Sequence, residues 1–127
     1  MTRKISLWLP VIFWFCLIFY FSDQPVIKAS NFDLVDFVIK KNAHFFEFFV
    51  LYLLLHRALA KNRTQAAYLV AVGYAFSDEI HQMFIPGRTA ALRDVFIDSL
   101  GITTAFFLLK IGILPRLFRF LSLKKIR

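Results

Sequence analysis

Long apolar runs separated by short polar segments dominate the chain and predict an all-helical membrane protein. Four runs are long enough to cross a hydrocarbon layer of roughly 30 Å, which takes about 20 helical residues. They cover residues 5–22, 43–60, 66–86 and 95–114, and Pro115 is predicted to end the last one. Short connections between the last three runs favour antiparallel neighbours. We therefore predict a single all-α domain over residues 1–127, a polytopic four-transmembrane-helix bundle.

The first run resembles a signal peptide, because Arg3 and Lys4 precede it. However, it is not followed by a small-residue cleavage site. Bulky aromatic residues at 19–21 lead instead into Ser22. A permanent membrane anchor is the better interpretation.

The stretch before the second run predicts a short interfacial helix. Ser30 with Asp33 resembles a capping box, and Asp36 and Lys40 continue the polar stripe that Asp33 begins. Apolar residues occupy the other faces, as expected for a helix that lies at the membrane surface. This helix is predicted to lead straight into the second run. At the end of the chain, residues 115–127 alternate basic and apolar side chains, which predicts a tail held against anionic cytoplasmic headgroups.

Composition supports the membrane interpretation. Hydrophobic residues make up 59% of the chain and charged residues only 19%, so a water-facing surface is hard to build. The formal net charge of +8 would suit nucleic acid, but the basic residues cluster at helix ends without an aromatic-interleaved groove. We therefore predict membrane lipids, and not nucleic acid, as partners. The single cysteine, Cys16, excludes an intramolecular disulfide and a Cys-based zinc site, and no cofactor is predicted.

The distribution of Lys and Arg predicts a membrane protein with both termini in the cytoplasm. In this orientation ten basic residues fall in cytoplasmic segments. Five fall in outer segments, namely Lys28, Lys40, Lys41, Arg88 and Arg93. The eight acidic residues all fall on the outer side: Asp23, Asp33, Asp36, Glu47, Asp78, Glu79, Asp94 and Asp98.

Polar residues at helical spacing gather in the outer halves of three predicted spans. The sets are Lys41, His44 and Glu47 on the second; Asp78, Glu79, His81 and Gln82 on the third; and Arg88, Arg93, Asp94 and Asp98 at the fourth. A charge within a span costs about 2.5–3.5 kcal/mol at the helix centre, so such side chains normally turn inward and find partners. Gly101 continues the last stripe and would allow close helix approach. A single outward-facing polar site is the economical prediction.

Two motifs in these sets resemble the signature of the VanZ-like family of small multi-pass bacterial membrane proteins. One is Lys41-x-x-His44 with Glu47; the more specific one is Asp78-Glu79-x-x-Gln82-x-Phe84-x-Pro86-Gly87-Arg88, followed by Arg93-Asp94, Asp98 and Gly101. The resemblance covers roughly residues 22–101. Phe48 stands where a tyrosine is expected and Asp98 where an asparagine is common, so those two family roles do not carry over unchanged. Because the founding member is linked to teicoplanin resistance, the resemblance implies glycopeptide-type antibiotic resistance or envelope homeostasis.

Three functions are open at this point. In the first, Lys41, Arg88 and Arg93 bind an anionic envelope ligand such as a lipid-linked precursor or a lipoglycopeptide, because the planar fork of arginine suits phosphate and carboxylate. The remaining members of the predicted binding set orient these bases, namely His44, Glu47, Asp78, Glu79, Gln82, Asp94 and Asp98. In the second, the same charges form a structural ion-pair network that binds nothing.

The third function is an intramembrane metal-assisted hydrolase. His44, His81 and two carboxylates would hold the metal, Glu79 would act as general base, and Asp78 is a further catalytic candidate. A His-Glu-x-x-His run is absent from the sequence, so no metal is assigned. Whether any reaction occurs, and the oligomeric state, do not follow from the sequence.

Overall fold

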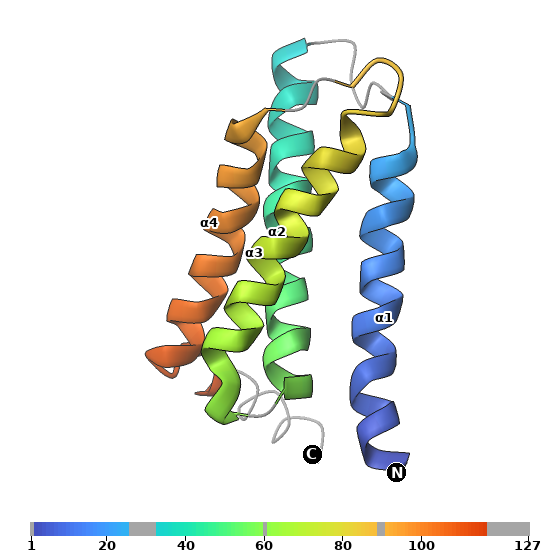
Figure 1. Ribbon diagram of the computed structural model, residues 1–127. Coiled ribbons are helices and arrows are strands. Elements are labelled where there is room, and N and C mark those ends of the chain that lie inside the picture. Colours follow the sequence, from blue (N-terminus) through green and yellow to red (C-terminus); the bar gives the residue numbers. More distant parts are fainter. Residues whose placement is uncertain (1, 26–32, 60, 89–90, 117–127) are drawn as a thin grey trace, which may run out of the picture.

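Helix is the regular secondary structure of every described segment, which confirms the all-α prediction. The computed structural model describes residues 2–25, 33–59, 61–88 and 91–116. The helices are α1 (Thr2–Asp23), α2 (Asp33–Leu59), the short 3-10 helix η1 (Lys61–Arg63), α3 (Thr64–Gln82) and α4 (Leu92–Lys110). The four long helices run alternately up and down, so α1 and α3 end where α2 and α4 begin (Figure 1). We call this end of the bundle the polar end.

The interfacial helix predicted before the second span leads straight into that span, as expected, and is not a separate element. Residues 33–43 continue without a break into α2, which is 27 residues long. Neither glycine nor proline interrupts this stretch, and local side-chain contacts support it. Lys40 pairs with Asp36 at 2.7 Å, and the Asn42 amide donates to the carbonyl oxygen of Val38 at 2.8 Å. Ser30, the predicted cap, lies outside the described residues.

Two helix ends differ from the predictions. α3 ends at Gln82, four residues before the predicted end of the third span, and turns at 83–87 follow. α4 ends at Lys110, so the prediction that Pro115 ends it is wrong. Gly112 has a φ of 78°, a left-handed conformation that glycine adopts without strain, and its N–H donates to the Leu109 carbonyl oxygen at 3.2 Å. A further helical turn at residues 113–116 contains Pro115.

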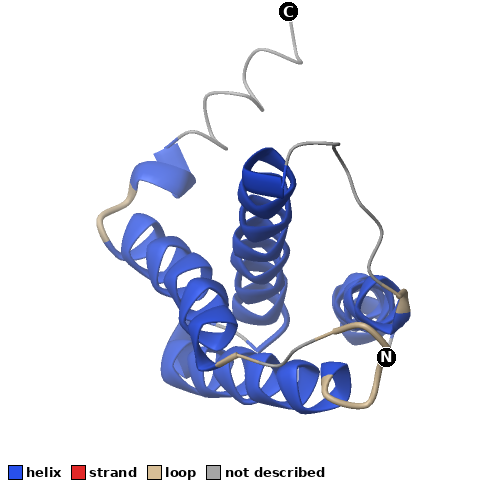
Figure 2. Cartoon of the chain, turned by 90° about the horizontal axis from the view of Figure 1, so that it is seen from above, coloured by secondary structure: helices blue, strands red, loops and turns tan. Residues whose placement is uncertain are grey.

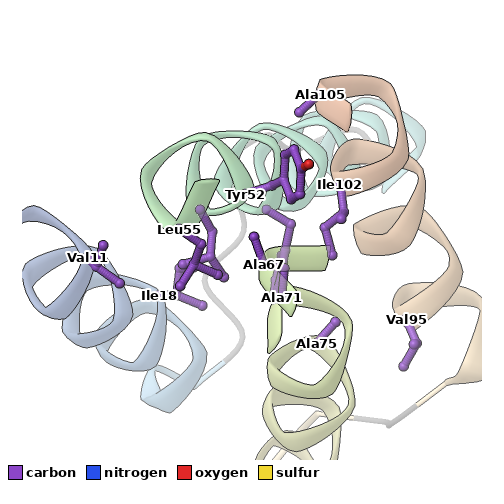
Figure 3. Packing of buried hydrophobic residues seen from close by; sticks show 12 residues of the cluster. Val11, Ile18, Tyr52, Leu55, Ala67, Ala71, Ala75, Val95, Ile102 and Ala105 are labelled. Atoms are coloured by element: carbon purple, nitrogen blue, oxygen red, sulfur yellow. The ribbon is translucent and has the colours of Figure 1, made fainter. Parts of the chain in front are cut away.

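The core lies where α2, α3 and α4 meet. Ala67, Ala71 and Ala75 repeat every four residues along one face of α3, and all three are fully buried. Their small side chains let Tyr52 of α2 and Ile102 of α4 approach α3 closely (Figure 3). The apolar core extends along these helices, from the end opposite the polar end to Val95 in the first turn of α4.

α2 is the central helix of the bundle. It contacts each of the other long helices, whereas α1 contacts α2 and α3 and, within the described residues, does not touch α4. Seen from above, α1 stands at one side of α3 and α4 at the other (Figure 2). Val11 and Ile18 are the α1 side chains that bury fully against this core.

Apolar length by itself supports one of the four predicted spans. Among the described helices, residues Ile5–Asp23 of α1 are long and apolar enough to cross a membrane. The other three long helices carry the polar and charged residues of the predicted site, which lowers their apolar character.

α2 and α4 approach each other most closely at Gly101, which is buried. A β-carbon placed there would overlap the backbone carbonyl oxygen of Phe45 and lie 3.2 Å from the backbone nitrogen of Phe49. Both opposing atoms belong to the backbone of α2, so they cannot move aside as a flexible side chain would. Only glycine permits this helix contact.

Replacing Gly101 with alanine is therefore expected to force α2 and α4 apart and to lower the free energy of unfolding by about 1–3 kcal/mol. Gly73 offers a matched control, because nothing lies within 4 Å of a β-carbon built there. Gly73→Ala should stabilise its helix by up to about 1 kcal/mol. Thermal unfolding of both variants in detergent measures the difference. Equal midpoints for the two variants would contradict the close contact.

Candidate functional site

The acidic residues of the chain lie in the half of the bundle that includes the polar end. They come from the last turns of α1 and α3 and the first turns of α2 and α4, while Glu47 lies deepest, near the middle of α2. Four helix ends thus bring together residues that are far apart in sequence. This geometry allows the single polar site that the spacing predicts.

An open cavity of about 670 Å³ lies at the polar end. Its charged lining is balanced, with four basic residues (Lys40, Lys41, Arg88 and Arg93) and four acidic ones (Asp33, Asp36, Glu47 and Asp94). His44 and Gln82 add further polar groups to the wall. Of the predicted binding set, Asp78, Glu79 and Asp98 do not line the cavity; they are buried.

One ion pair joins α2 to α4 at the cavity wall. The Lys41 ammonium donates to the Asp94 carboxylate, and both side chains are largely buried. Phe37, one turn earlier on α2, lies under both Lys41 and Arg93, with its ring centre 5.4 Å and 5.0 Å from their charged groups. The Arg93 side chain is 64% exposed, so its guanidinium is the accessible cation of this wall.

Arg88 connects the loop after α3 to the end of α1. Its guanidinium donates to the carbonyl oxygen of Phe21 at 2.9 Å, to that of Gln24 at 3.0 Å, and to the Gln82 side-chain oxygen at 3.1 Å. The two carbonyls belong to the C-terminal end of α1, whose last carbonyl groups lack helical partners. Arg88 therefore acts as a clamp between two helices, with three of its five N–H groups used.

A chain of hydrogen bonds leads from Arg88 into the interior. Gln82 accepts from Arg88 through its oxygen and donates from its nitrogen to Oδ2 of Asp78 at 2.8 Å and to the Ser22 hydroxyl at 3.3 Å. The carboxylate of Asp78 is thus fixed through one oxygen. Its other oxygen, Oδ1, is buried and has no hydrogen-bond partner among the described residues.

Glu79 stabilises the start of α4. Its carboxylate accepts a hydrogen bond of 2.5 Å from the backbone N–H of Ala91, the N-cap residue of that helix. Negative charge near a helix amino terminus is favourable. The sequence suggested Glu79 as a general base. In the structure its carboxylate accepts a hydrogen bond from a backbone N–H.

Three side chains meet between α2, α3 and α4, and we call them the His44 cluster: His44, Asp78 and Asp98. One potential ligand atom from each lies within 4.8 Å of the others. Nδ1 of His44 lies 3.4 Å from Oδ1 of Asp98, and neither atom has a hydrogen-bond partner among the described residues. The Asp98 side chain is 1% exposed, whereas His44 is 18% exposed on the cavity side.

His81, the other predicted metal candidate, lies outside the His44 cluster. Its Nε2 is 3.3 Å from Oδ1 of Asp23, and its ring lies 4.6 Å from that of Phe19. Both contacts are with the end of α1. The structure therefore separates the two histidines that the hydrolase hypothesis placed together.

The sequence matches the VanZ/LLP1 family over residues 7–115, which is most of the chain. The chain belongs to this family. The match confirms the family that the motifs at Lys41 and Asp78 predicted.

The VanZ/LLP1 chain is also similar to a curated protein of Bacillus subtilis (strain 168), the uncharacterized membrane protein YwnJ. The two are 38% identical over 90 residues, which is 65% of this chain. The matched part spans 62% of the length of that relative. No solved structure gives a significant match.

Some residues that shape this VanZ/LLP1 site were not predicted from the sequence. Phe37 was not singled out, although its position four residues before Lys41 places both on one helical face. Ser22 is 2% exposed and contacts Gln82, and its place as the first polar residue after an apolar run was the available signal. The carbonyl groups that Arg88 binds carry no signal in the sequence, because every residue has one.

Arg88→Lys tests the clamp. A lysine keeps the charge but cannot reproduce three donors in a fixed fork, so the end of α1 should open more often. We expect faster amide hydrogen exchange at residues 20–24, equivalent to a loss of about 1–3 kcal/mol in local opening free energy. Arg93→Lys is the matched control, because the described contacts of Arg93 are with Phe37 and Asp94. Equal exchange in the two variants would exclude the clamp.

Proposed function

We propose that this chain is an integral protein of the bacterial cell membrane whose four long helices cross the bilayer and whose polar-end cavity binds the anionic headgroup of an envelope amphiphile. The amphiphile would be a lipid-linked envelope precursor or a lipoglycopeptide. Through this binding the protein would contribute to envelope homeostasis or to resistance against glycopeptide-type antibiotics such as teicoplanin.

Large exposed apolar side chains on all four long helices support the membrane placement. Examples are Phe13 on α1 (65% exposed), Phe46 on α2 (59%), Leu69 on α3 (70%) and Phe96 on α4 (63%). A monomer in water rarely exposes this much contiguous apolar surface, whereas lipid chains would cover it at no cost. The name of the Bacillus subtilis relative, a membrane protein, agrees with this placement.

The orientation follows from the basic residues. The excess of Lys and Arg at the end opposite the polar end favours the cytoplasm for that end. Both termini would then be cytoplasmic, and the polar-end cavity would open outward, toward envelope components.

Single cysteines test this topology in a Cys16→Ala background. Arg93→Cys, at the polar end, should react with a membrane-impermeant maleimide added to intact cells. Arg63→Cys, in the exposed η1 segment at the opposite end, should react only after the membrane is made permeable. The reverse labelling pattern would invert the proposed orientation.

The cavity at the polar end is the observation that carries the binding proposal. Its volume of about 670 Å³ falls in the range of small-ligand sites, roughly 300–1,000 Å³. Arg93 presents an accessible guanidinium on its wall, held over Phe37, and such a group binds phosphate or carboxylate through two parallel hydrogen bonds. Lys41 would reinforce this contact by sharing its ammonium between Asp94 and the ligand.

A purely structural network accounts for part of the same residues. Arg88 donates to two backbone carbonyl oxygens and Glu79 accepts from a backbone N–H, so these contacts stabilise helix ends. Arg93 does not fit that account, since its side chain is mostly exposed. Metal-assisted hydrolysis is less well supported, because the proposed base Glu79 is engaged with Ala91 and His81 lies apart from His44.

Binding measurements on purified protein test the proposal, with teicoplanin and with phosphatidylglycerol in nanodiscs as probes. Arg93→Ala should weaken binding of at least one probe about tenfold, the size expected for one charge-assisted hydrogen bond. Arg63→Ala removes the same charge at the opposite end of the bundle and should leave the affinity unchanged. Unchanged binding in Arg93→Ala, or equal losses in both variants, would remove the cavity as the binding site.

A further inference from the structure

We propose that the His44 cluster binds one divalent transition-metal ion of the Zn²⁺ or Mn²⁺ type. Nδ1 of His44 and Oδ1 of both Asp78 and Asp98 would be the protein ligands. This site goes beyond the proposed function, because headgroup binding at Arg93 requires no metal.

The spacing of the cluster suits a metal ion. With metal–ligand bonds of about 2.1 Å, two ligands of a tetrahedral site lie about 3.4 Å apart. Nδ1 of His44 and Oδ1 of Asp98 are separated by 3.4 Å, and the set that includes Asp78 lies within 4.8 Å. Each ligand comes from a different helix, so the bundle itself defines the site.

The cluster also carries buried polar atoms that the protein leaves unsatisfied. Asp78 is 4% exposed and Asp98 1%. Among the described residues Oδ1 of Asp78 has no hydrogen-bond partner, and Oδ1 of Asp98 has the long 3.4 Å contact with His44 in place of a hydrogen bond. Buried carboxylate oxygens without partners are costly, and buried charges are normally paired or coordinate metals. A cation placed between these oxygens and the imidazole would satisfy all three ligand atoms together.

Carboxyl groups outnumber basic groups around the cluster. Glu47 lies within electrostatic range of His44, Asp78 and Asp98, so three carboxyl groups lie near one imidazole. The nearby bases are committed elsewhere, since Lys41 pairs with Asp94 and Arg88 reaches the cluster only through Gln82. A divalent ion would offset this surplus.

Hydrogen bonds from neighbouring residues orient the proposed ligands, as such bonds do around bound metal ions in proteins. Gln82 donates to Oδ2 of Asp78, which leaves Oδ1 available to a cation, and Arg88 in turn fixes Gln82. Hydrogen bonds of this kind hold ligating carboxylates in place. His44 also lines the polar-end cavity, which gives the ion a path in from solvent.

The ligand types decide the class of ion. One imidazole nitrogen with two carboxylate oxygens suits Zn²⁺ or Mn²⁺, whereas Mg²⁺ and Ca²⁺ prefer oxygen ligands throughout. Cysteine does not take part in the cluster, which argues against a thiolate-selective ion such as Cu⁺.

Metal titration of the purified full-length chain tests the site. After chelator treatment and its removal, Zn²⁺ and Mn²⁺ are added separately and followed by calorimetry and by elemental analysis of the washed protein. The wild type should bind about one equivalent of at least one of the two ions. His44→Gln and Asp98→Asn, which nearly preserve side-chain size, should each weaken binding at least tenfold.

His81→Gln is the matched control, because His81 lies at the same end of the bundle but outside the cluster. It should bind the metal as the wild type does. Thermal unfolding gives a second readout, in which the bound metal should raise the midpoint of the wild type and of His81→Gln but not of His44→Gln. Absence of stoichiometric metal in the wild type, or equal losses in His44→Gln and His81→Gln, would overturn the site.

The metal site and headgroup binding can fail separately. Arg93→Ala should keep full metal binding, and Asp98→Asn, whose side chain does not line the cavity, should keep the Arg93-dependent binding of the probe. Loss of metal in Arg93→Ala would show that the ion does not depend on the His44 cluster alone, which contradicts the proposed ligand set.

Discussion

The contact between α2 and α4 at Gly101 determines where the functional groups of this protein lie. Without a side chain at that position, α4 rests directly on the backbone of α2 at Phe45. The two helices begin at the same end of the bundle, so this contact also fixes their register toward the polar end. One turn away His44 meets Asp98, and one turn further Lys41 meets Asp94. A shift of one residue between the helices would break both pairs.

The polar groups around this contact have two different roles. Arg88, Glu79 and Lys41 satisfy helix ends and join helices, and each engages protein atoms directly. Asp78 and Asp98 lie deeper, and each retains a buried oxygen that makes no hydrogen bond to the described residues. Residues that only hold a fold together do not usually keep such atoms, because an unsatisfied buried acceptor destabilises the folded state. This contrast separates the structural charges from the candidate ligands within one small region.

Toward the opposite end the core of the bundle is apolar, while its surface carries both apolar and basic side chains. Alanines on α3 allow α2 and α4 to pack closely, while large apolar side chains point outward from all four long helices. A chain of this length gains little core in water, and a lipid environment would cover the outer apolar surface that the bundle cannot. The polar end is therefore the part of the molecule suited to chemistry or recognition.

The sequence by itself determined the helical class, the family, the approximate position of each helix and the gathering of acidic residues at one end. These features are local or additive, since apolar run length, helical spacing and short connections specify them without reference to distant contacts. It also indicated that Gly101 allows close approach, because the glycine continues the stripe of Asp94 and Asp98.

The tertiary structure decided which polar residues meet. The pairs are Lys41 with Asp94, His44 with Asp98, and His81 with Asp23. The spacing of polar residues along each helix did not determine any of these pairings. The tertiary structure also decided that Arg88 binds backbone carbonyls and that Gly112 rather than Pro115 ends α4. The physical reason is that the period of a helix fixes the face on which a side chain lies, whereas rotation and register between helices depend on packing over the whole bundle.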